Sequence, residues 1–436
     1  MKFYSTKERA KKVSLKEAVL TGMPEDGGLY MPEEFPQLEK DFFDKIENLS
    51  LKQIAKTVAK KFLDDIPSNI IDEIIEEAIN FDAPVKVFSQ QIAVLELFHG
   101  PTLAFKDFGA RFMSRLMAYF VRSTGKKLYV LVATSGDTGS AVASGFYRVP
   151  DINVVLLYPS GKVSTIQEKQ LTTMGSNIIP LEVDGNFDDC QRLVKTAFVD
   201  RDLNSKIMLT SANSINIARL IPQSFYYFYA YAQLKKRSKA LVISVPSGNL
   251  GNLTGGIIAK KMGLPVSRFI AATNINSTFT DYLETGQFKP RATIRTISNA
   301  MDVGNPSNFE RLQDIYQHSV DDMRKDIKSF SFDDKRTMEA IAEFYEKYKY
   351  ILDPHGAVGY LGLKKFMEEN RDKNLTGVFL ETAHPAKFLD TVQSVVEEKL
   401  EIPERLKKFL EREKKSIKVS REYRDFKEFL ISMETK

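Results

Sequence analysis

Short apolar segments alternate with helical patterns from about residue 92 onward, and this alternation leaves few architectures open to the chain. Strands that are buried on both faces read as continuous apolar runs, and parallel sheets covered by helices are built from such strands. The expected strands are 128–133, 154–158, 178–183, 241–245, 269–272 and 377–380. We therefore expect an α/β fold with parallel sheets, whose functional loops lie at the carboxyl ends of the strands.

The regions before and after this alternating part have a different character. Apolar residues recur at helical spacing in 51–63 and 70–79, which predicts a mainly helical region at the start of the chain. The stretch from about Pro403 is rich in Lys, Arg and Glu, and we expect a solvated helical tail without chemistry there. The expected divisions are an N-terminal region 1–80, a large α/β domain 81–110 and 206–402, a smaller α/β domain 111–205, and a tail 403–436.

The composition argues against several classes of protein. The chain has 436 residues, and its net charge of +5 is spread along its length, so no basic tract indicates nucleic-acid binding. The single cysteine, Cys190, excludes an internal disulfide and is expected to be a packed thiol. No apolar run is long enough to cross a membrane, and no signal-peptide pattern follows Met1. We expect a cytoplasmic protein with small anionic ligands and with neither nucleic-acid nor membrane partners.

One lysine, Lys106, lies within a run of apolar and small residues that extends from Leu97 to Gly109. Burial disfavours the ammonium and favours the neutral amine, which can attack a carbonyl and form a Schiff base. This is how a protein holds pyridoxal phosphate, an electron sink for carbanions. The alternative is a solvated surface lysine, which is the usual place of this residue.

A glycine-rich turn follows the strand expected at 241–245. Glycines let the backbone approach an anion closely, and the N–H groups at the start of the next helix bind phosphate. The turn lacks the lysine of a Walker loop and the G-x-G-x-x-G spacing, so ATP and dinucleotides are weakly supported. A flexible turn is the alternative. The residues concerned are Ser247, Gly248, Asn249, Leu250, Gly251 and Asn252.

Two further turns carry hydroxyl, amide and guanidinium groups. The turn 133–139 offers hydroxyls and N–H groups to a carboxylate, or it caps the following helix through Asp137 or Thr138. The segment 213–219 is expected to open a long helix, and its start together with Arg219 suits a second phosphate. Helix capping with a surface arginine is the alternative there.

Polar residues also follow the strand expected at 377–380. Thr382 can make one hydrogen bond at this strand end, and a hydroxyl, unlike a carboxylate, would leave a pyridine nitrogen unprotonated; the alternative is a simple loop. Three of the four histidines, His99, His355 and His384, lie in polar turns. They lack metal-ligand spacing, so we expect structural or substrate-facing histidines and no metal.

Taken in order, these segments resemble the threonine synthase family of fold-type II pyridoxal-phosphate enzymes. The most specific match is His99–Phe108, and two others support it independently: 247–252 and 381–387. The likeness extends from the Asp26-Gly27-Gly28 turn to about Lys387, and the long N-terminal region resembles the longer bacterial and fungal branch. The resemblance implies a tryptophan synthase β-like fold with two parallel-sheet domains and a helical N-terminal region.

The resemblance also implies a role for each matching residue. Lys106 would form the Schiff base with the cofactor and act as the catalytic residue, and Thr382 would hydrogen-bond the pyridine nitrogen. Many fold-type II relatives have asparagine beside the cofactor 3′-oxygen where this chain has Asp137, although the longer branch shares the aspartate; its role stays open. Backbone N–H groups of Gly248, Asn249, Leu250, Gly251 and Asn252 would hold the cofactor phosphate, Ser135, Gly136 and Thr138 the substrate carboxylate, and Asn213, Ser214, Asn216 and Arg219 the substrate phosphate.

The reaction that the resemblance implies is the conversion of O-phospho-L-homoserine and water to L-threonine and phosphate, the last step of threonine biosynthesis. It combines a γ-elimination with β-addition of water, and it needs a second anion site that a dehydratase does not need. Two alternatives remain. One is a pyridoxal-phosphate lyase that makes a 2-keto acid from a phosphorylated or hydroxylated amino acid, and the other is a silent metabolite-binding protein. We expect a monomer or a homodimer.

Overall fold

The chain folds into two compact units, which we describe one at a time. The computed structural model describes residues 1–134, 136–237, 240–371 and 374–434. Unit 1 contains Met1, Met31–Phe105 and Leu220–Glu401, and unit 2 contains Lys2–Tyr30, Lys106–Arg219 and Ile402–Lys436. The chain therefore passes between the units directly before Lys106 and directly after Arg219. The four-part division drawn from the sequence pattern stays a prediction.

Unit 1 is built on a six-stranded sheet with the order β12-β11-β10-β13-β5-β4. The pairs are parallel except for β4 with β5 at one edge. The apolar runs at 241–245, 269–272 and 377–380 are strands of this sheet, as predicted. In chain order the strands are β4 (Val85–Val87), β5 (Ile92–Glu96), β10 (Leu241–Pro246), β11 (Val266–Thr273), β12 (Ile327–Ser331) and β13 (Thr376–Glu381).

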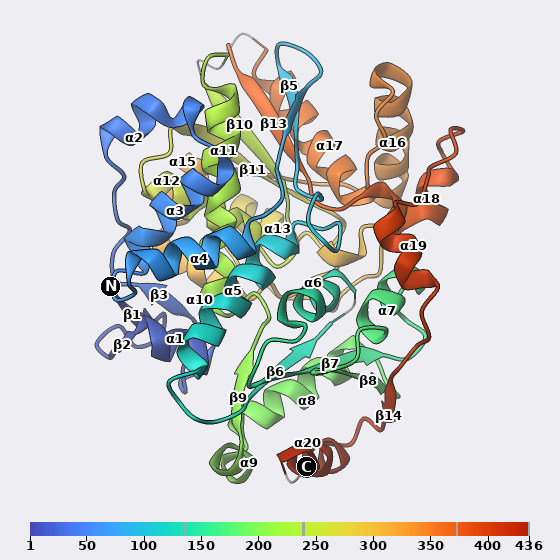
Figure 1. Cartoon of the computed structure of the whole chain (residues 1–436). Helices are drawn as coiled ribbons and strands as arrows, with labels where there is room; N and C mark the ends of the chain where they lie inside the picture. Colours follow the sequence, from blue (N-terminus) through green and yellow to red (C-terminus); the bar gives the residue numbers. More distant parts are fainter. Residues whose placement is uncertain (135, 238–239, 372–373, 435–436) are drawn as a thin grey trace. The chain divides into compact units, whose positions relative to one another are not determined.

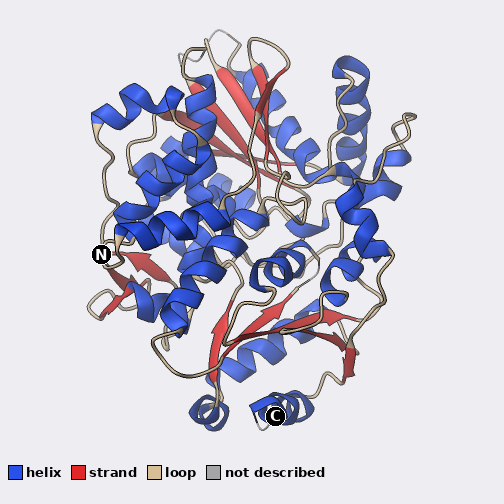
Figure 2. Cartoon of the chain, in the orientation of Figure 1, coloured by secondary structure: helices blue, strands red, loops and turns tan. Residues whose placement is uncertain are grey.

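Helices of unit 1 cover this sheet (Figure 2). Aromatic residues of the sheet and of these helices pack together in the core. Phe344, Tyr360 and Phe379 pack together in this core. The α-helices are α2 (Lys40–Lys45), α3 (Leu51–Phe62), α4 (Ser68–Ala78), α11 (Phe225–Leu234), α12 (Gly251–Lys261), α13 (Thr278–Thr285), α14 (Phe309–Ile315), α15 (Val320–Asp326), α16 (Asp334–Tyr348), α17 (Pro354–Glu369) and α18 (Leu389–Gln393). Short 3-10 helices are η1 (Ile46–Asn48), η2 (Ile221–Ser224), η3 (Asn299–Met301) and η4 (Pro385–Phe388).

The predicted N-terminal helices are present, and local chemistry explains where one of them begins. The side chains of Ser50 and Gln53 form a reciprocal capping box at the start of α3. Leu51, Ile54 and Val58 then recur on one face of the helix and are buried. The helical spacing of apolar residues in the sequence is therefore the spacing of the buried face.

Unit 2 contains a five-stranded parallel sheet with the order β14-β8-β7-β6-β9. Helices α6 and α7 lie on one face, and α8 and α20 lie on the other (Figure 1). The elements are β6 (Leu128–Ala133), β7 (Ile152–Pro159), β8 (Ile178–Val183), β9 (Met208–Ser211), β14 (Ile417–Val419), α5 (Lys106–Val121), α6 (Asp137–Phe146), α7 (Thr165–Thr172), α8 (Phe187–Val199), α9 (Arg201–Lys206), α19 (Glu404–Leu410) and α20 (Tyr423–Glu434). A three-stranded sheet comprises β1 (Lys2–Ser5), β2 (Lys12–Ser14) and β3 (Tyr30–Pro32), with α1 (Leu15–Thr21) after β2.

Two sequence expectations about helices were wrong. The expected long helix after Asn213 is α10 (Ile217–Leu220), which gives way to η2 because Pro222 cannot donate a helical hydrogen bond. The C-terminal stretch is not a solvated tail: β14 pairs with β8, and Phe426 and Leu430 of α20 are fully buried in the core of unit 2. Its apolar residues looked sparse because their packing partners lie far away in the sequence.

Cys190 is buried in the same core, where burial raises the pKa of its thiol to about 12. It is thus the packed thiol that the sequence predicted. Within the described residues, we find no helix that combines the length and apolar character needed to span a bilayer.

Candidate active site

The glycine-rich loop joins β10 to α12 at the carboxyl end of the strand. Leu250 has a left-handed backbone with φ of 60° directly before α12 begins at Gly251. Gly248 is packed so tightly that a Cβ there would lie 2.7 Å from the Cα of Met301. The Leu253 N–H donates to Asn252 Oδ1 at 3.0 Å. A backbone turn into a helix N-terminus is a common place for an anion, because the first N–H groups of a helix have no acceptor within its own ladder. The residues present therefore fit the phosphate group of a cofactor.

Side-chain hydrogen bonds hold this loop in place. Asn252 Nδ2 donates to the carbonyl of Pro246 at 2.8 Å, and the Tyr227 hydroxyl donates to the carbonyl of Asn252 at 2.8 Å. The Ser247 hydroxyl donates to Val245 at 2.8 Å. The side-chain amide of Asn252 thus holds the end of β10. Only the backbone N–H of this residue is then a candidate donor to an anion.

A second segment, residues 298–308, packs along the loop. Asn249 Oδ1 accepts the Ser307 N–H at 2.5 Å, and Asn308 Nδ2 donates to the Asn249 carbonyl at 3.0 Å. Nη1 of the fully buried Arg311 donates to Asn308 Oδ1 at 2.7 Å. Burial lowers the pKa of Arg311 to about 9. Sequence reasoning missed this buried cation, because nothing in the sequence links it to the loop.

Lys106 is the first residue of α5 and is half-buried. The backbone before it pairs with the segment after β13: the Phe105 N–H donates to the carbonyl of the buried Thr382 at 2.8 Å, and the His384 N–H donates to Leu103 at 3.0 Å. Because Lys106 is covalently bonded to Phe105, their Cα atoms are about 3.8 Å apart. The lysine therefore directly follows a residue whose backbone is hydrogen-bonded to Thr382.

Arg219 packs against the helix that Lys106 begins. A Cβ at Gly109 would lie 2.9 Å from both Nε and the carbonyl oxygen of Arg219, and residues spaced by three share a helix face. Its Nη1 donates to the carbonyl of Ala212 at 2.8 Å. Burial lowers the pKa of Arg219 to about 10, although Asp107 opposes this, so the guanidinium is a cation at neutral pH. Unit 2 thus holds a buried positive charge beside the face of α5 that carries Lys106.

The turn between β6 and α6 is fixed by a threonine that the sequence analysis did not select. Thr134 Oγ1 accepts the N–H groups of Gly136 at 3.0 Å and Gly139 at 2.9 Å. Gly136 is buried, and Thr138 is half-buried in the first turn of α6. Ser135, expected in the same turn, lies outside the described residues.

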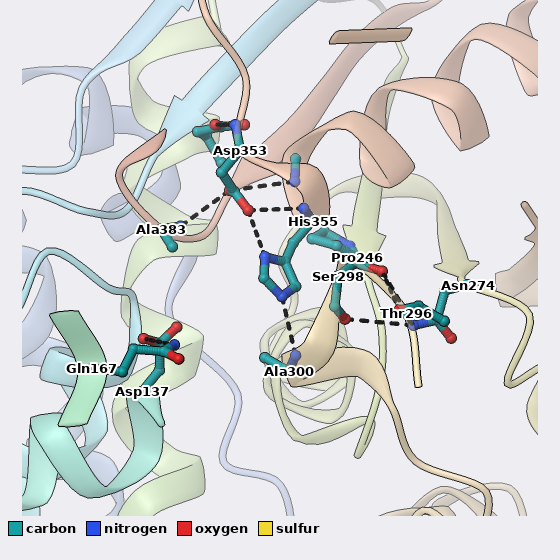
Figure 3. A network of polar contacts seen from close by, with 12 residues as sticks. Asp137, Gln167, Pro246, Asn274, Thr296, Ser298, Ala300, Asp353, His355 and Ala383 are labelled. Atoms are coloured by element: carbon teal, nitrogen blue, oxygen red, sulfur yellow. Dashed lines mark hydrogen bonds and ion pairs between the residues drawn. The ribbon is translucent and has the colours of Figure 1, made fainter. Parts of the chain in front are cut away.

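Asp137, the first residue of α6, is paired with a side chain from α7. Gln167 Nε2 donates to Asp137 Oδ1 at 3.0 Å (Figure 3). Gln167 is buried, and a Cβ at Gly136 would meet its amide at 2.6 Å. Sequence reasoning missed Gln167 because only the fold brings α7 to this turn.

The segment after β9 carries the other residues that were expected to bind phosphate. Asn213 Nδ2 donates to the carbonyl at the end of β6 at 3.1 Å, and Ser214 is half-buried. Asn216 is fully buried, and its Nδ2 donates to Val19 at 2.9 Å and to Ser211 at 3.2 Å. Since both amide hydrogens of Asn216 are used, this side chain fixes the turn.

Several titratable groups gather near the end of β13. Glu96 accepts hydrogen bonds from His99 Nε2 at 2.7 Å, Lys86 Nζ at 2.7 Å and the Tyr350 hydroxyl at 2.8 Å. Burial alone would raise the pKa of Glu96, but these bonds lower it below its ordinary value. Burial, with a further contribution from His99, lowers the pKa of His384 to about 4, so this imidazole is neutral at neutral pH.

A second acidic group connects β13 to α17. Glu381, the last residue of β13, accepts the Asp353 N–H at 2.5 Å. Burial, together with the nearby Asp353 carboxylate, raises the pKa of Glu381 well above its ordinary value. Asp353 caps α17 and also accepts from His355 Nδ1 and from the Ala383 N–H (Figure 3). The Asp-Pro pair at 353–354 is a helix-start signal, but nothing in the sequence links it to Glu381.

Comparisons with known proteins identify the family of the chain. The family described as "Pyridoxal-phosphate dependent enzyme" matches residues 85–380. "Threonine synthase N terminus" matches residues 2–79, and "Threonine synthase, C-terminal" matches residues 356–430.

Full-length relatives carry the same description. The threonine synthase of Escherichia coli is 43% identical over 408 residues, which cover 93% of this chain and 94% of the relative. A crystal structure of that species' enzyme has a TM-score of 0.92 at 40% identity and covers 99% of this chain and 100% of its own. The structure of PLP-bound threonine synthase from Brucella melitensis has a TM-score of 0.93 at 32% identity, with 100% of both chains covered. The chain therefore belongs to the threonine synthase family of pyridoxal-phosphate dependent enzymes.

Proposed function

We propose that this enzyme converts O-phospho-L-homoserine and water to L-threonine and phosphate. The observation that carries the proposal is the buried guanidinium of Arg219, which packs beside Gly109 on the helix that Lys106 begins. The 247–252 loop of unit 1 would bind the phosphate of the cofactor. The buried Arg219 is a further cation on the helix of the lysine, and it suits a second phosphate, which would be that of a phosphorylated substrate. The likeness to threonine synthases over nearly the whole chain supports the same reaction.

Four elements of the chain would hold pyridoxal phosphate. Lys106 would bind it covalently, the backbone N–H groups of 248–252 would take its phosphate, and the Thr382 hydroxyl would meet its ring nitrogen. Asp137, held by Gln167, would lie beside its ring oxygen. When bound, the cofactor draws negative charge away from the substrate Cα.

The residues of the chain would bind the substrate and move its protons. Lys106 would take the proton from Cα, and a further proton leaves Cβ before phosphate departs from Cγ. Water would then supply the hydroxyl at Cβ and one proton. The three protons released, from Cα, Cβ and water, would go to Cγ, which becomes the methyl group, back to Cα, and to the departing phosphate, so that one phosphate leaves for each threonine formed. Gly136, Thr138 and Ser135 would take the substrate carboxylate.

Asn213, Ser214 and Arg219 would take the substrate phosphate. Asn216 would hold this segment in place without contacting the phosphate through its side-chain amide, because both amide hydrogens donate to the carbonyls of Val19 and Ser211. A Thr382 hydroxyl, rather than a carboxylate, at the ring nitrogen would keep this nitrogen neutral. Competing loss of the substrate as a keto acid would then have to be limited by the exclusion of water from the site.

The test is an assay of phosphate release combined with detection of threonine, carried out on the wild type, Arg219→Ala and Arg219→Lys. We expect Arg219→Ala to lose about one to a few kcal/mol of transition-state stabilisation, roughly tenfold or more in kcat/KM, and to lose inhibition by inorganic phosphate. Arg219→Lys keeps the positive charge but not the planar guanidinium. Its kcat/KM should lie between those of the wild type and Arg219→Ala. Arg122→Ala, an exposed position in the same unit, is the control and should leave the kinetics unchanged.

Two results would contradict the proposal. Phosphate release with 2-oxobutanoate and ammonia in place of threonine would show a different lyase. Unchanged kinetics in Arg219→Ala would remove this residue from the substrate site.

A further inference from the structure

A buried carboxylate–imidazole pair lies at the start of α17 in unit 1. His355 and Asp353 are both almost fully buried, and His355 Nδ1 is hydrogen-bonded to Asp353 Oδ1 (Figure 3). The Asp353 side chain also accepts the N–H groups of His355 at 2.8 Å and Ala383 at 3.3 Å. The ring of Phe388 packs against the imidazole at 4.9 Å between centroids. The imidazole is therefore held in one orientation.

The other ring nitrogen of His355 has a backbone partner. The Ala300 N–H donates to His355 Nε2 at 3.2 Å. An acceptor role at Nε2 places the ring proton on Nδ1, where it is donated to Asp353. Both nitrogens are thus engaged with the protein itself, so the imidazole is not a group that transfers a substrate proton.

Ala300 belongs to η3, and η3 forms the wall against which the glycine loop packs. A Cβ on Gly248 would lie 2.9 Å from the carbonyl oxygen of Ala300 and 2.7 Å from the Cα of Met301. Because not even a methyl group would fit between them, the position of η3 limits where the Gly248 backbone can lie. The hydrogen bond from Ala300 to His355 therefore acts on the N–H groups of the loop through a single contact, that of η3 with Gly248.

We propose that His355 is a positioning residue for the cofactor phosphate: held by Asp353, it fixes η3 and thereby the 247–252 loop. This rests on the proposed role of that loop in binding the phosphate. Asp353 Oδ2 accepts the N–H of Ala383, next to Thr382, without His355, so the contact at the proposed ring-nitrogen partner does not depend on the imidazole.

The experiment compares two aldehydes that both react with Lys106 but differ in the phosphate. Full-length protein is freed of cofactor, and the dissociation constants of pyridoxal phosphate and of pyridoxal are measured by equilibrium dialysis, with the visible absorbance of the bound aldehyde as readout. In His355→Phe the Ala300 N–H loses its acceptor. We expect pyridoxal phosphate to bind about fivefold to tenfold more weakly, as the loss of one buried hydrogen bond predicts, with pyridoxal affinity unchanged. In His355→Gln the side-chain oxygen can accept the Ala300 N–H, so part of the affinity returns.

Hydrogen exchange of the cofactor-free protein gives a readout that is independent of binding and turnover. The Ala300 amide should exchange faster in His355→Phe than in the wild type. The control is His318→Asn: His318 is exposed, and its φ of 61° suits asparagine, so neither the two affinities nor the exchange should change.

The outcomes separate this proposal from the proposed function. Equal losses for both aldehydes in His355→Phe, or no loss for either, would overturn the positioning role. If the wild type itself bound the two aldehydes equally well, the proposed phosphate role of the 247–252 loop would fail instead.

Discussion

The close packing of Gly248 allows a quantitative prediction for Gly248→Ala. The new Cβ would lie 2.7 Å from the Cα of Met301 and 2.9 Å from the carbonyl oxygen of Ala300. Both neighbours are backbone atoms, which cannot rotate away as a side chain can. Overpacking of this kind costs typically about 1–3 kcal/mol, and the strain is relieved by a shift of the loop. If the shift comes fully at the expense of phosphate binding, affinity for pyridoxal phosphate falls about tenfold to a hundredfold.

Equilibrium dialysis with pyridoxal phosphate measures this loss directly. The control is Lys335→Ala, an exposed position of α16 in the same unit. Exposed substitutions that break no specific contact change the free energy little, so this variant should bind the cofactor like the wild type. Wild-type affinity in Gly248→Ala would refute the idea that a close backbone approach at this loop serves the phosphate.

Three further predictions concern stability. Burial, with the nearby Asp353 carboxylate, raises the pKa of Glu381 well above its ordinary value, so above about pH 4.5 the unfolded chain loses a proton that the folded chain keeps up to the raised pKa. Folding stability should therefore fall in this range by up to about 1.4 kcal/mol per pH unit. In Glu381→Gln this contribution to the pH dependence of the urea midpoint should vanish, and an unchanged slope would contradict the prediction. Asp353→Asn would place an NH2 group against an N–H donor in either orientation of the amide, because both carboxylate oxygens accept N–H groups. It should lower the urea midpoint by the equivalent of about 1–3 kcal/mol, and an unchanged midpoint would argue against the hydrogen bonds from His355 and Ala383. Phe426→Ala empties a core position in unit 2 and should cost about 3–5 kcal/mol; a loss under about 1 kcal/mol would mean that α20 is not part of that core.

Local chemistry made several parts of the structure predictable from the sequence. The apolar run 241–245 followed by a glycine-rich turn indicated a strand, a loop and a helix, and β10 and α12 confirm it. The expected parallel sheets are also present, and the strand ends at Ala133, Pro246 and Glu381 each lead into a candidate turn. These features are encoded by neighbouring residues, so a single sequence displays them.

Contacts between distant segments could not be predicted in this way. His355 was recognised only as a histidine in a polar turn, and its partner Ala300 lies 55 residues away. Gln167 has no sequence signal of its own, because it reaches Asp137 only through the fold. The C-terminal tail was misjudged for the same reason, because β14 gains its hydrogen bonds from β8, far earlier in the chain.

We propose that Lys106 carries the cofactor, and chemical trapping tests this most directly. Full-length protein loaded with pyridoxal phosphate is reduced with borohydride and digested, and the modified peptide is identified by mass spectrometry. We predict one reduced cofactor group per chain, on Lys106, and none in Lys106→Ala treated alongside. A label on another lysine of the wild type, with Lys106 unmodified, would contradict it.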